Sequence, residues 1–254
     1  MLCDAHIHVG QFYDIYTSPE DLSVFLKEIG VDAIAVSSTT TCEENYNKVE
    51  KEIESLIKVF GKVTIPILWV TPALLNNETK LIKMLNHVDW KCIKVHPQLC
   101  PDEWDASNCN FKKAVELSKE LKAPLMIHTG VVRNCHPCQL QPLFSKYPEQ
   151  SFIMAHGRPI EEAISVMKEC PNTYVDTAFM PIPYIAKLIK LGLSNRILWG
   201  SDYPIIKFHD PNVNTCLYYN NLIDELKHHI THSDYIKITQ TNFLDVFNVI
   251  GDLY

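Results

Sequence analysis

Eight short apolar segments alternate with amphipathic segments along almost the whole chain, and this alternation limits the fold more than any other feature. Each of the eight is nearly continuously apolar, rich in β-branched residues and bounded by glycine, proline or polar residues. That pattern is typical of parallel strands that are buried on both faces. The segments span residues 2–8, 31–38, 63–70, 92–97, 123–130, 151–157, 172–178 and 196–204.

The stretches between these segments have helical periodicity. Apolar side chains in residues 46–60 recur at three- and four-residue steps, as on one face of a helix. Ser18 followed by Pro19 predicts the start of the first helix, and Gly30 predicts its end. Further helices are expected at residues 76–87, 108–121, 138–147, 159–169, 182–192, 214–230 and 239–250.

Strands that alternate with helices belong to the α/β class, and eight of them can close into a (β/α)₈ TIM barrel or open into a doubly wound sheet. The count of eight and the length of 254 residues favour the barrel. No linker or sequence repeat interrupts the alternation. A single domain is therefore predicted for residues 1–254, and 46% apolar content is enough for one large core.

The overall charge excludes several kinds of partner. With a formal net charge of -7, the chain offers no basic surface for nucleic acid or anionic lipid, so we expect a small-molecule partner. Apolar stretches such as residues 63–70 are far shorter than the roughly 18 residues of a membrane helix, so no membrane contact is expected. No leader is visible, which predicts a cytoplasmic protein. The nine cysteines are irregularly spaced and are expected to be reduced.

Histidines and one aspartate stand where several apolar segments end. Side chains two apart on a strand share a face, so Asp4, His6 and His8 are expected to share one. The two histidines alone are a weak signal, because eleven histidines in 254 residues produce about 0.5 such spacings by chance. Other segments end at His96, His128, His156 and Asp202.

In a parallel barrel these segment ends meet at one rim, where active sites lie. Imidazole and carboxylate groups suit a zinc-like divalent ion, and catalytic sites leave one position open for water. The pattern therefore predicts a metal site at the carboxyl ends of the strands. The alternative for His128 and His156 is that they are ordinary strand-end histidines held by backbone hydrogen bonds.

Five motifs occur in a fixed order: DAHIH at 4–8, IHTG at 127–130, AHG at 155–157, NTYVDTA at 172–178 and WGSDYP at 199–204. Together with KVHP at 94–97 and NFLDVFN at 242–248, they resemble the amidohydrolase-related family of metal-dependent hydrolases. The resemblance covers essentially the whole chain. It implies a distorted (β/α)₈ barrel with one divalent ion, most often Zn²⁺.

The resemblance also implies roles for individual residues. The implied metal ligands are His6, His8, His128 and Asp202. His156 would lie beside the metal and polarise the scissile carbonyl. Such an ion lowers the pKa of a bound water toward neutrality, and Asp202 would pass the proton of that water to the leaving group.

Lys94 and His96 share a face of the fourth predicted strand and are candidates to bind substrate. In the wider superfamily that the motifs resemble, a carboxylated lysine on this strand can bridge two metals. The alternative is a plain ammonium that binds a substrate carboxylate or pairs with an acid. We favour the plain ammonium, because the resemblance points to one metal.

Two arginines and one acid are weaker candidates. Arg158 follows the AHG motif and Arg133 follows the HTG segment, so each could bind an anionic substrate or form a surface salt bridge. Asp176, on the seventh predicted strand, is expected to accept a hydrogen bond from substrate or from a histidine, or to be a structural acid.

Cysteines and aromatic residues near the predicted rim also have two interpretations. Cys135 and Cys138 have the spacing of a redox motif, but they fall after the fifth predicted strand and are better explained as loop thiols. Phe12, Tyr13 and Trp69 could line a pocket or simply pack within the barrel.

These observations favour a metal-dependent hydrolase that uses an activated water on an amide, ester or lactone of a small, carboxylated molecule. The resemblance brings a second candidate, a non-oxidative decarboxylase or hydratase with the same ligands, in which the metal would stabilise developing negative charge. The third candidate is a barrel that has lost catalysis and serves only to bind a ligand. The protein could also form a homodimer.

Overall fold

The computed structural model describes residues 1–104 and 109–249. Three predictions therefore lie partly outside the described residues: the start of the helix at 108–121, the end of the helix at 239–250 and the end of the domain at 1–254. Within the described part of the chain, no helix is both long enough and apolar enough to cross a bilayer.

Nine strands in the described part of the chain form one curled sheet with the order β2-β1-β3-β4-β5-β6-β7-β8-β9. Only β2 is antiparallel, and each of the eight parallel strands overlaps one of the eight predicted segments, although β1 runs on to Phe12 and β9 keeps only Ile197 and Leu198 of residues 196–204. The α/β class is thus confirmed. The strands are β1 (Cys3–Phe12), β2 (Ile15–Thr17), β3 (Ala33–Ser38), β4 (Val63–Trp69), β5 (Cys92–Val95), β6 (Leu125–His128), β7 (Phe152–Ala155), β8 (Thr173–Asp176) and β9 (Ile197–Leu198).

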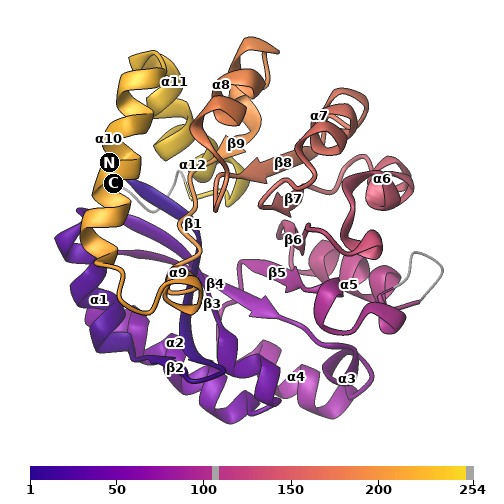
Figure 1. The fold of residues 1–254 in the computed structure, drawn as a ribbon. Coiled ribbons are helices and arrows are strands. Elements are labelled where there is room, and N and C mark those ends of the chain that lie inside the picture. The colour runs from indigo at the N-terminus through magenta and orange to yellow at the C-terminus, as the bar shows by residue number, and fades with distance from the viewer. Residues whose placement is uncertain (105–108, 250–254) are drawn as a thin grey trace.

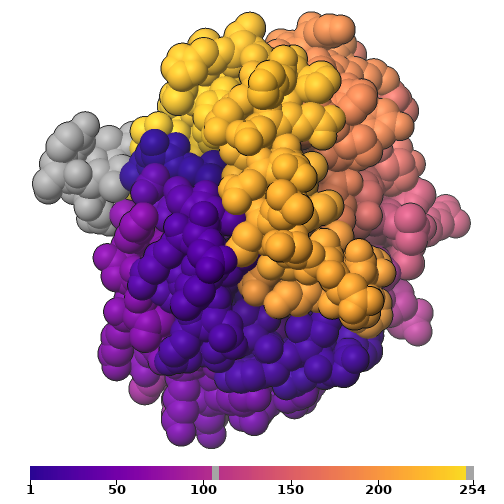
Figure 2. All heavy atoms as spheres, turned by 60° about the vertical axis from the view of Figure 1, so that its left-hand side comes forward, coloured from indigo at the N-terminus to yellow at the C-terminus, as the bar shows by residue number. Residues whose placement is uncertain are grey.

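The curl of the sheet brings its last parallel strand back to its first. The amide of Ala5 donates to the carbonyl oxygen of Trp199 at 2.9 Å, and the amide of Asp202 donates to the carbonyl oxygen of His6 at 2.7 Å. Figure 1 shows the strands inside a ring of helices, and in Figure 2 the orange and yellow segments pack directly on the indigo ones. Residues far apart in sequence therefore share one rim.

Helices follow most of the strands and cover the outer face of the sheet (Figure 1). Each predicted helix is present with ends that differ by a few residues. The helices are α1 (Pro19–Glu28), α2 (Tyr46–Phe60), α3 (Pro72–Leu75), α4 (Glu78–His87), α5 (Cys109–Glu120), α6 (Pro137–Lys146), α7 (Ile160–Glu169), α8 (Ile182–Lys190), α9 (Ile206–His209), α10 (Thr215–His229), α11 (His232–Ile236) and α12 (Asn242–Val246).

Local chemistry explains where the first helices begin and end. The Ser18 side chain accepts a hydrogen bond from the amide of Asp21, and Pro19 occupies the first helical position of α1. Helix α2 starts in the same way at Asn45 and ends at Gly61, whose φ of 64° suits a residue without a Cβ atom. Helix α11 was not predicted, and it makes the tail helical from His232 rather than from residue 239.

The core has an inner and an outer layer. The outer layer lies between the strands and the helices and contains large residues such as Ile34 and Leu56. The inner cluster lies within the curled sheet, where the small side chains of Ala5 and Ala33 leave room for Phe243 and Phe247. These two aromatic residues belong to α12 and the residue directly after it, which together we call the α12 region. The α12 region therefore seals the end of the sheet at which the strands begin.

A bulge in β1 changes which side chains point inward. The pairing of β1 with β3 shifts between Asp4 and Ile7, so Cys3 and Ala5 belong to the inner cluster before the shift, whereas His8 faces inward after it. Our prediction that Asp4 shares a face with His6 and His8 is therefore wrong. Strand pairing, which local sequence does not show, causes the difference.

Candidate metal centre

A cavity of about 360 Å³ opens at the carboxyl ends of the strands, and we call it the cup. Its floor is polar and consists of side chains from β1, β5 and β6 and from the turns after β5, β7 and β9. The floor contains His6, His8, Lys94, His96, His128, His156 and Asp202. These are the histidines, the lysine and the aspartate at the ends of the predicted segments, so the fold brings them into one cavity.

Three of these side chains could hold a metal ion together. One ligand atom each from His6, His156 and Asp202 lies within 4.8 Å of the others, and all three residues are buried. His8 is close to this group, because its Nε2 atom lies 2.9 Å from Oδ1 of Asp202. Two imidazoles and a carboxylate are the donors that zinc-like ions prefer.

Hydrogen bonds hold the histidines so that their Nε2 atoms face the cup. Nδ1 of His6 lies 2.9 Å from a carboxylate oxygen of Asp176, and Nδ1 of His156 lies 3.2 Å from the carbonyl oxygen of Ala178. Both partners are acceptors, so each Nδ1 atom carries the proton and donates it. The lone pair of each imidazole is then on Nε2, which is the arrangement that a metal ligand needs.

The Nδ1 atom of His8 lies 2.9 Å from the hydroxyl oxygen of Ser37 on β3. A hydroxyl can donate or accept, so this contact orients the ring without deciding which nitrogen is protonated. Ser37 was not among our candidates. Its position at the end of a buried strand, two residues after Ala35, is the only signal in the sequence.

Burial keeps the imidazoles neutral. It lowers the pKa of His6 and of His8 well below the usual value, and the nearby Lys94 ammonium lowers both further. Burial also lowers the pKa of His156 to about 3, although the carboxylates of Asp202 and Asp176 act in the opposite direction. A neutral imidazole is the form that binds a cation.

Lys94 lies at the centre of the floor. Its Nζ atom is 2.8 Å from Nε2 of His6 and 3.3 Å from Nε2 of His8, and it stands 4.9 Å from the centre of the Trp69 ring. The side chain is 1% exposed. Burial lowers the pKa of Lys94 to about 8, with Asp202 and Asp176 opposing the shift.

His96 and His128 form a separate pair on one side of the cup. Their rings stack with centres 3.7 Å apart, and the other face of His96 stacks on Trp69. Nε2 of His128 lies 3.0 Å from the side-chain oxygen of Gln98. His128, an implied metal ligand, is thus in the cavity but outside the group of His6, His156 and Asp202.

Asp176 lies behind the floor and is fully buried. One carboxylate oxygen accepts from His6, and the other accepts from the amides of His156 and Ala178 at 3.0 Å each. His156 has a φ of 70°, a left-handed conformation that is uncommon for histidine. Asp176 therefore holds both the backbone of His156 and the ring of His6.

Asp202 stands on a tight turn that approaches β1 closely. Its φ is 53°, and a Cβ atom on the preceding Gly200 would lie 3.0 Å from Cβ of His6 and 3.3 Å from Cβ of Asp176. Only glycine fits there without displacing a neighbour. Asp4 supports the same turn from below, because its Oδ1 atom accepts from the amides of His6 and Ser201.

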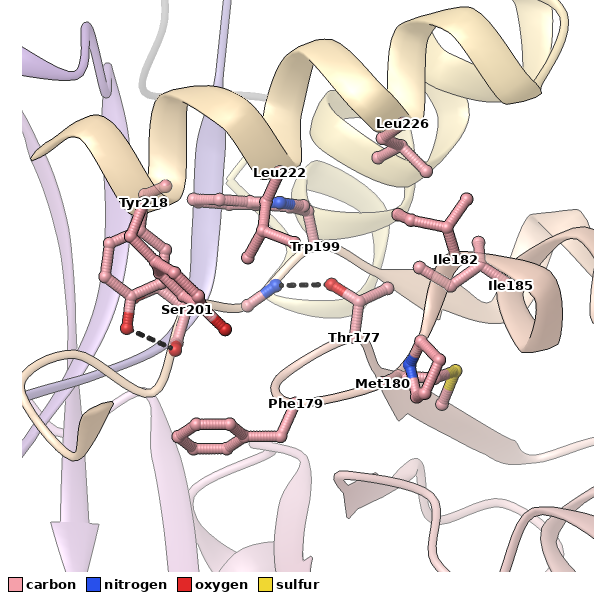
Figure 3. A pocket seen from close by; sticks show the side chains of 13 residues that line it. Thr177, Phe179, Met180, Ile182, Ile185, Trp199, Ser201, Tyr218, Leu222 and Leu226 are labelled. Carbon is pink, nitrogen blue, oxygen red and sulfur yellow. Dashed lines mark hydrogen bonds between the residues drawn. The ribbon is translucent and has the colours of Figure 1, made fainter. Parts of the chain in front are cut away.

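Helix α10 holds this turn from the outside (Figure 3). The Tyr219 hydroxyl donates to the carbonyl oxygen of Ser201 at 3.0 Å, and the amide of Gly200 donates to Oγ1 of Thr177 at 3.1 Å. Apolar side chains of α8 and α10 surround a pocket of about 220 Å³ behind these bonds. Phe179 lines both this pocket and the cup.

The arginines differ in position. Arg158 lines the cup, and its buried Nε atom has no hydrogen-bond partner among the described residues. Arg133 is exposed and is not among the described residues that line the cup. Of the predicted aromatic residues, Phe12, Tyr13 and Trp69 all line it.

Cys135 and Cys138 lie outside the cup. Cys135 is buried, and burial raises its pKa to about 12. Burial and the Glu162 carboxylate also raise the pKa of Cys138. Neither thiol is in the ionised form that redox chemistry uses.

Comparison with known proteins gives one family and several related folds. A family model described as "Amidohydrolase" matches residues 3–230. No curated protein matches the chain. Three solved structures match at least 97% of this chain, and the match includes at least 96% of each of those proteins.

The first of these structures is an uncharacterised TIM-barrel protein from Bordetella bronchiseptica (14% identity over 97% of this chain and 98% of that one, TM-score 0.74). The second is a probable 2-pyrone-4,6-dicarboxylic acid hydrolase from Acinetobacter baumannii (13% identity, 97% and 99%, TM-score 0.70). The third is a 4-oxalomesaconate hydratase from Rhodopseudomonas palustris (16% identity, 98% and 96%, TM-score 0.68). At these identities the structures show that the fold is similar.

Proposed function

Because the chain belongs to the amidohydrolase family, and is therefore an enzyme of the hydrolase type, we propose that it is a metal-dependent hydrolase of small carboxylated molecules. The bond that it cleaves would be an amide, an ester or a lactone. The observation that carries the proposal is the buried group of His6, His156 and Asp202, in which the protonated Nδ1 atoms leave Nε2 of each imidazole turned toward the cup.

The side chains present fit one divalent ion, and we propose Zn²⁺. His6, His8 and Asp202 would hold it, with His156 beside it and with His128 as a further ligand if its ring leaves Gln98. An ion bound by such donors polarises a carbonyl oxygen and lowers the pKa of a water molecule to near neutrality. Burial keeps the imidazoles of His6 and His8 neutral by lowering their pKa, and a neutral imidazole is the form that such binding requires.

The protons of the reaction would be handled by Asp202 and His156. Asp202 has one oxygen 2.9 Å from His8 and the other 3.9 Å from Nε2 of His156, so it faces the point where a water and a substrate would meet. We propose that Asp202 takes a proton from the water and returns it to the leaving group. His156 would stabilise the charge that develops on the substrate carbonyl.

Two cationic groups would bind the substrate carboxylate. The Arg158 Nε atom is buried without a hydrogen-bond partner among the described residues, and a carboxylate is the group that a guanidinium matches best. Lys94 brings an ammonium to the same floor. We keep the plain ammonium for Lys94, whereas His96 would contact substrate from the side of the cup. The contacts of Asp176 suit the role of orienting His6 better than that of contacting substrate.

A lyase reaction is the second candidate, because a cup with a metal site and carboxylate anchors also suits decarboxylation or hydration. One solved structure with a similar fold is named as a hydratase. In that case Asp202 and His156 would move a proton to or from carbon, and no acyl bond would break.

The test begins with the metal content of the purified protein, followed by a screen of lactones, amides and carboxylic acids. We expect one metal per chain and release of an acid from a lactone or amide. Release of carbon dioxide, or addition of water to a double bond, would identify the lyase. Two metals per chain would overturn the single-metal scheme and the plain ammonium of Lys94.

A matched pair of histidine variants makes the test specific. We expect His6→Ala to lose both the metal and the activity. His228→Ala is the control, because the ring of His228 is exposed on α10 and bonds only to its own helix among the described residues. If His6→Ala kept its metal and its activity, the proposed centre would be wrong, and a barrel that only binds would gain support if no metal were found at all.

A further inference from the structure

We propose that a second cavity beside the cup forms the distal part of the substrate site, and that it takes an aromatic end of the substrate that is neutral or cationic rather than a second carboxylate. We call this cavity the side chamber. The proposal rests on the proposed function, since it assumes that the reacting group binds in the cup. It is tested by binding, so that its failure can be distinguished from failure of the hydrolase assignment.

The side chamber lies directly beside the cup and shares lining residues with it. Its volume is about 510 Å³, compared with about 360 Å³ for the cup. Residues at the ends of β1 and β4 and in the turns after β1 and β5 line both cavities. The shared residues are Phe12, Tyr13, Trp69, His96 and Leu99. In our proposal, a substrate longer than the cup reaches the side chamber along these shared side chains.

The wall between the two cavities is flat and aromatic. Trp69 and His96 stack with ring centres 5.3 Å apart and an angle of 15° between their planes. Trp104 adds a second indole to the side chamber. Planar apolar groups pack well against such surfaces, because aromatic rings favour stacked or edge-to-face contact.

One polar atom of this wall lacks a partner. The buried Nδ1 atom of His96 has no hydrogen-bond partner among the described residues, although the ring lines both cavities. A buried polar atom without a partner is costly, so a small rotation of the His96 ring that let a polar group of a ligand reach Nδ1 would be favourable.

The two cavities carry opposite charges. The cup has Lys94 and Arg158, whereas the described residues that line the side chamber include Glu43, Glu44 and Glu103 but no lysine or arginine. None of these three carboxylates has an ion-pair partner among the described residues. An anionic group would be repelled at that end of the site, and a cationic group would be attracted.

Three probes that share a benzoate skeleton test whether the side chamber prefers a cationic, a neutral or an anionic group. Each has a carboxylate for the cup, and the opposite end carries an ammonium in 4-(aminomethyl)benzoate, a methyl group in 4-methylbenzoate and a second carboxylate in terephthalate. We expect isothermal titration calorimetry of the purified protein to rank their affinities in that order. The ammonium probe should bind about tenfold more tightly than terephthalate at low salt.

Charge variants show whether the ranking comes from the side chamber. The triple variant Glu43→Gln, Glu44→Gln and Glu103→Gln should reduce the preference to about twofold or less. The control triple variant Glu120→Gln, Glu149→Gln and Glu225→Gln removes three exposed carboxylates elsewhere and changes the net charge equally. It should keep the preference of the original chain.

A size variant tests occupation of the chamber directly. Ala73 lines the chamber on the exposed side of α3, so Ala73→Trp would fill space without disturbing the cup. We expect it to weaken all three aromatic probes at least about fivefold and to leave acetate binding unchanged.

The proposal is overturned if terephthalate binds as tightly as the ammonium probe, or if the control triple variant shifts the preference as much as the test variant does. The proposal would also be overturned if the Ala73→Trp variant bound the three aromatic probes as tightly as the original chain does, or if no aromatic probe bound measurably. In each case the metal content and the effect of His6→Ala still decide the hydrolase assignment separately.

Discussion

The two ends of the curled sheet are closed in opposite ways. At the end where the strands begin, Phe243 and Phe247 pack among small apolar side chains such as Ala5. At the end where the strands finish, histidines, the carboxylate of Asp202 and the cations of Lys94 and Arg158 line an open cup. Burial of apolar area stabilises the first end, whereas the second end keeps buried polar groups that contribute little to stability. The residues that stabilise the fold and the residues proposed to carry out the reaction therefore lie at opposite ends of the same strands.

The bulge in β1 marks the boundary between these two ends. Before it, inward-facing side chains are apolar, and after it they are histidines. Substitutions on the two sides should therefore fail in different ways. Substitutions in the cup should change metal binding or activity, whereas substitutions of Phe243 or Phe247 should change stability alone.

The largest effect is expected from Asp202→Asn. Asparagine tolerates the left-handed conformation of Asp202 and keeps its size, but it cannot take up the proton. Activity should fall by about 10³-fold, as for loss of a general acid-base group. Initial rates measure this loss, and circular dichroism with a melting curve checks the fold. If Asp202→Asn kept its activity, the polar end of the sheet would not be where the proposed acid-base chemistry takes place.

Phe243→Ala should destabilise the end of the sheet at which the strands begin. Phe243 is 1% exposed, so the substitution leaves a cavity and should cost about 3–4 kcal/mol of unfolding free energy. The melting temperature should fall by roughly 10 °C. Urea unfolding gives the free energy, and activity per folded molecule should stay within about twofold.

Tyr184→Ala is the control for this prediction, because Tyr184 lies on α8 and is 41% exposed. It should cost less than about 1 kcal/mol. Loss of activity in Phe243→Ala at a temperature where the variant is fully folded would show that the two ends are coupled.

Asp176→Asn should have an intermediate effect confined to the metal. The amide oxygen of asparagine would accept from the backbone amides that now donate to Asp176 Oδ1, which leaves the NH₂ group facing Nδ1 of His6. An NH₂ group cannot accept from Nδ1, so the imidazole would no longer be held with its lone pair on Nε2. Metal affinity should fall about 10- to 100-fold, measured by competition with a chelator. Asp89→Asn, at an acid that is exposed, is the control and should change nothing. If the metal affinity of Asp176→Asn were unchanged, Asp176 would not be needed to orient His6 for metal binding.

The smallest effect is expected from Ser37→Ala. The variant loses one hydrogen bond to Nδ1 of His8, and a single such bond is worth about threefold in affinity. The same competition experiment measures it, with the exposed Ser233→Ala as control. A loss greater than that of Asp176→Asn would reverse the order of the two orienting contacts.

Much of the fold could be predicted because its signals are local. Apolar runs and helical periodicity depend on neighbouring residues, so the parallel strands and the main helices follow from them. The bulge near Asp4 and the hairpin strand β2 depend on pairing with other strands, and local patterns do not record pairing. The short helix α9 has no apolar period long enough to detect.

The candidate site shows the same division. Ionisable residues such as His156 and Asp202 end apolar runs, so their shared location followed from the barrel rule. The orienting contact of Ser37, the pairing of His128 with Gln98 and the side chamber depend on turns whose shape comes from long-range packing. Residue types at such positions carry no periodic signal.

Contacts between the first strand and the turn after β9 also have a consequence for biosynthesis. His8 and Asp202 meet across 194 positions of sequence, and the α12 region that seals the opposite end is made later still. A nascent chain therefore exposes the apolar inner face of its first strands until nearly all of these residues have been translated. Such distant contacts slow folding, so chaperone demand during translation should be high for a chain of this topology.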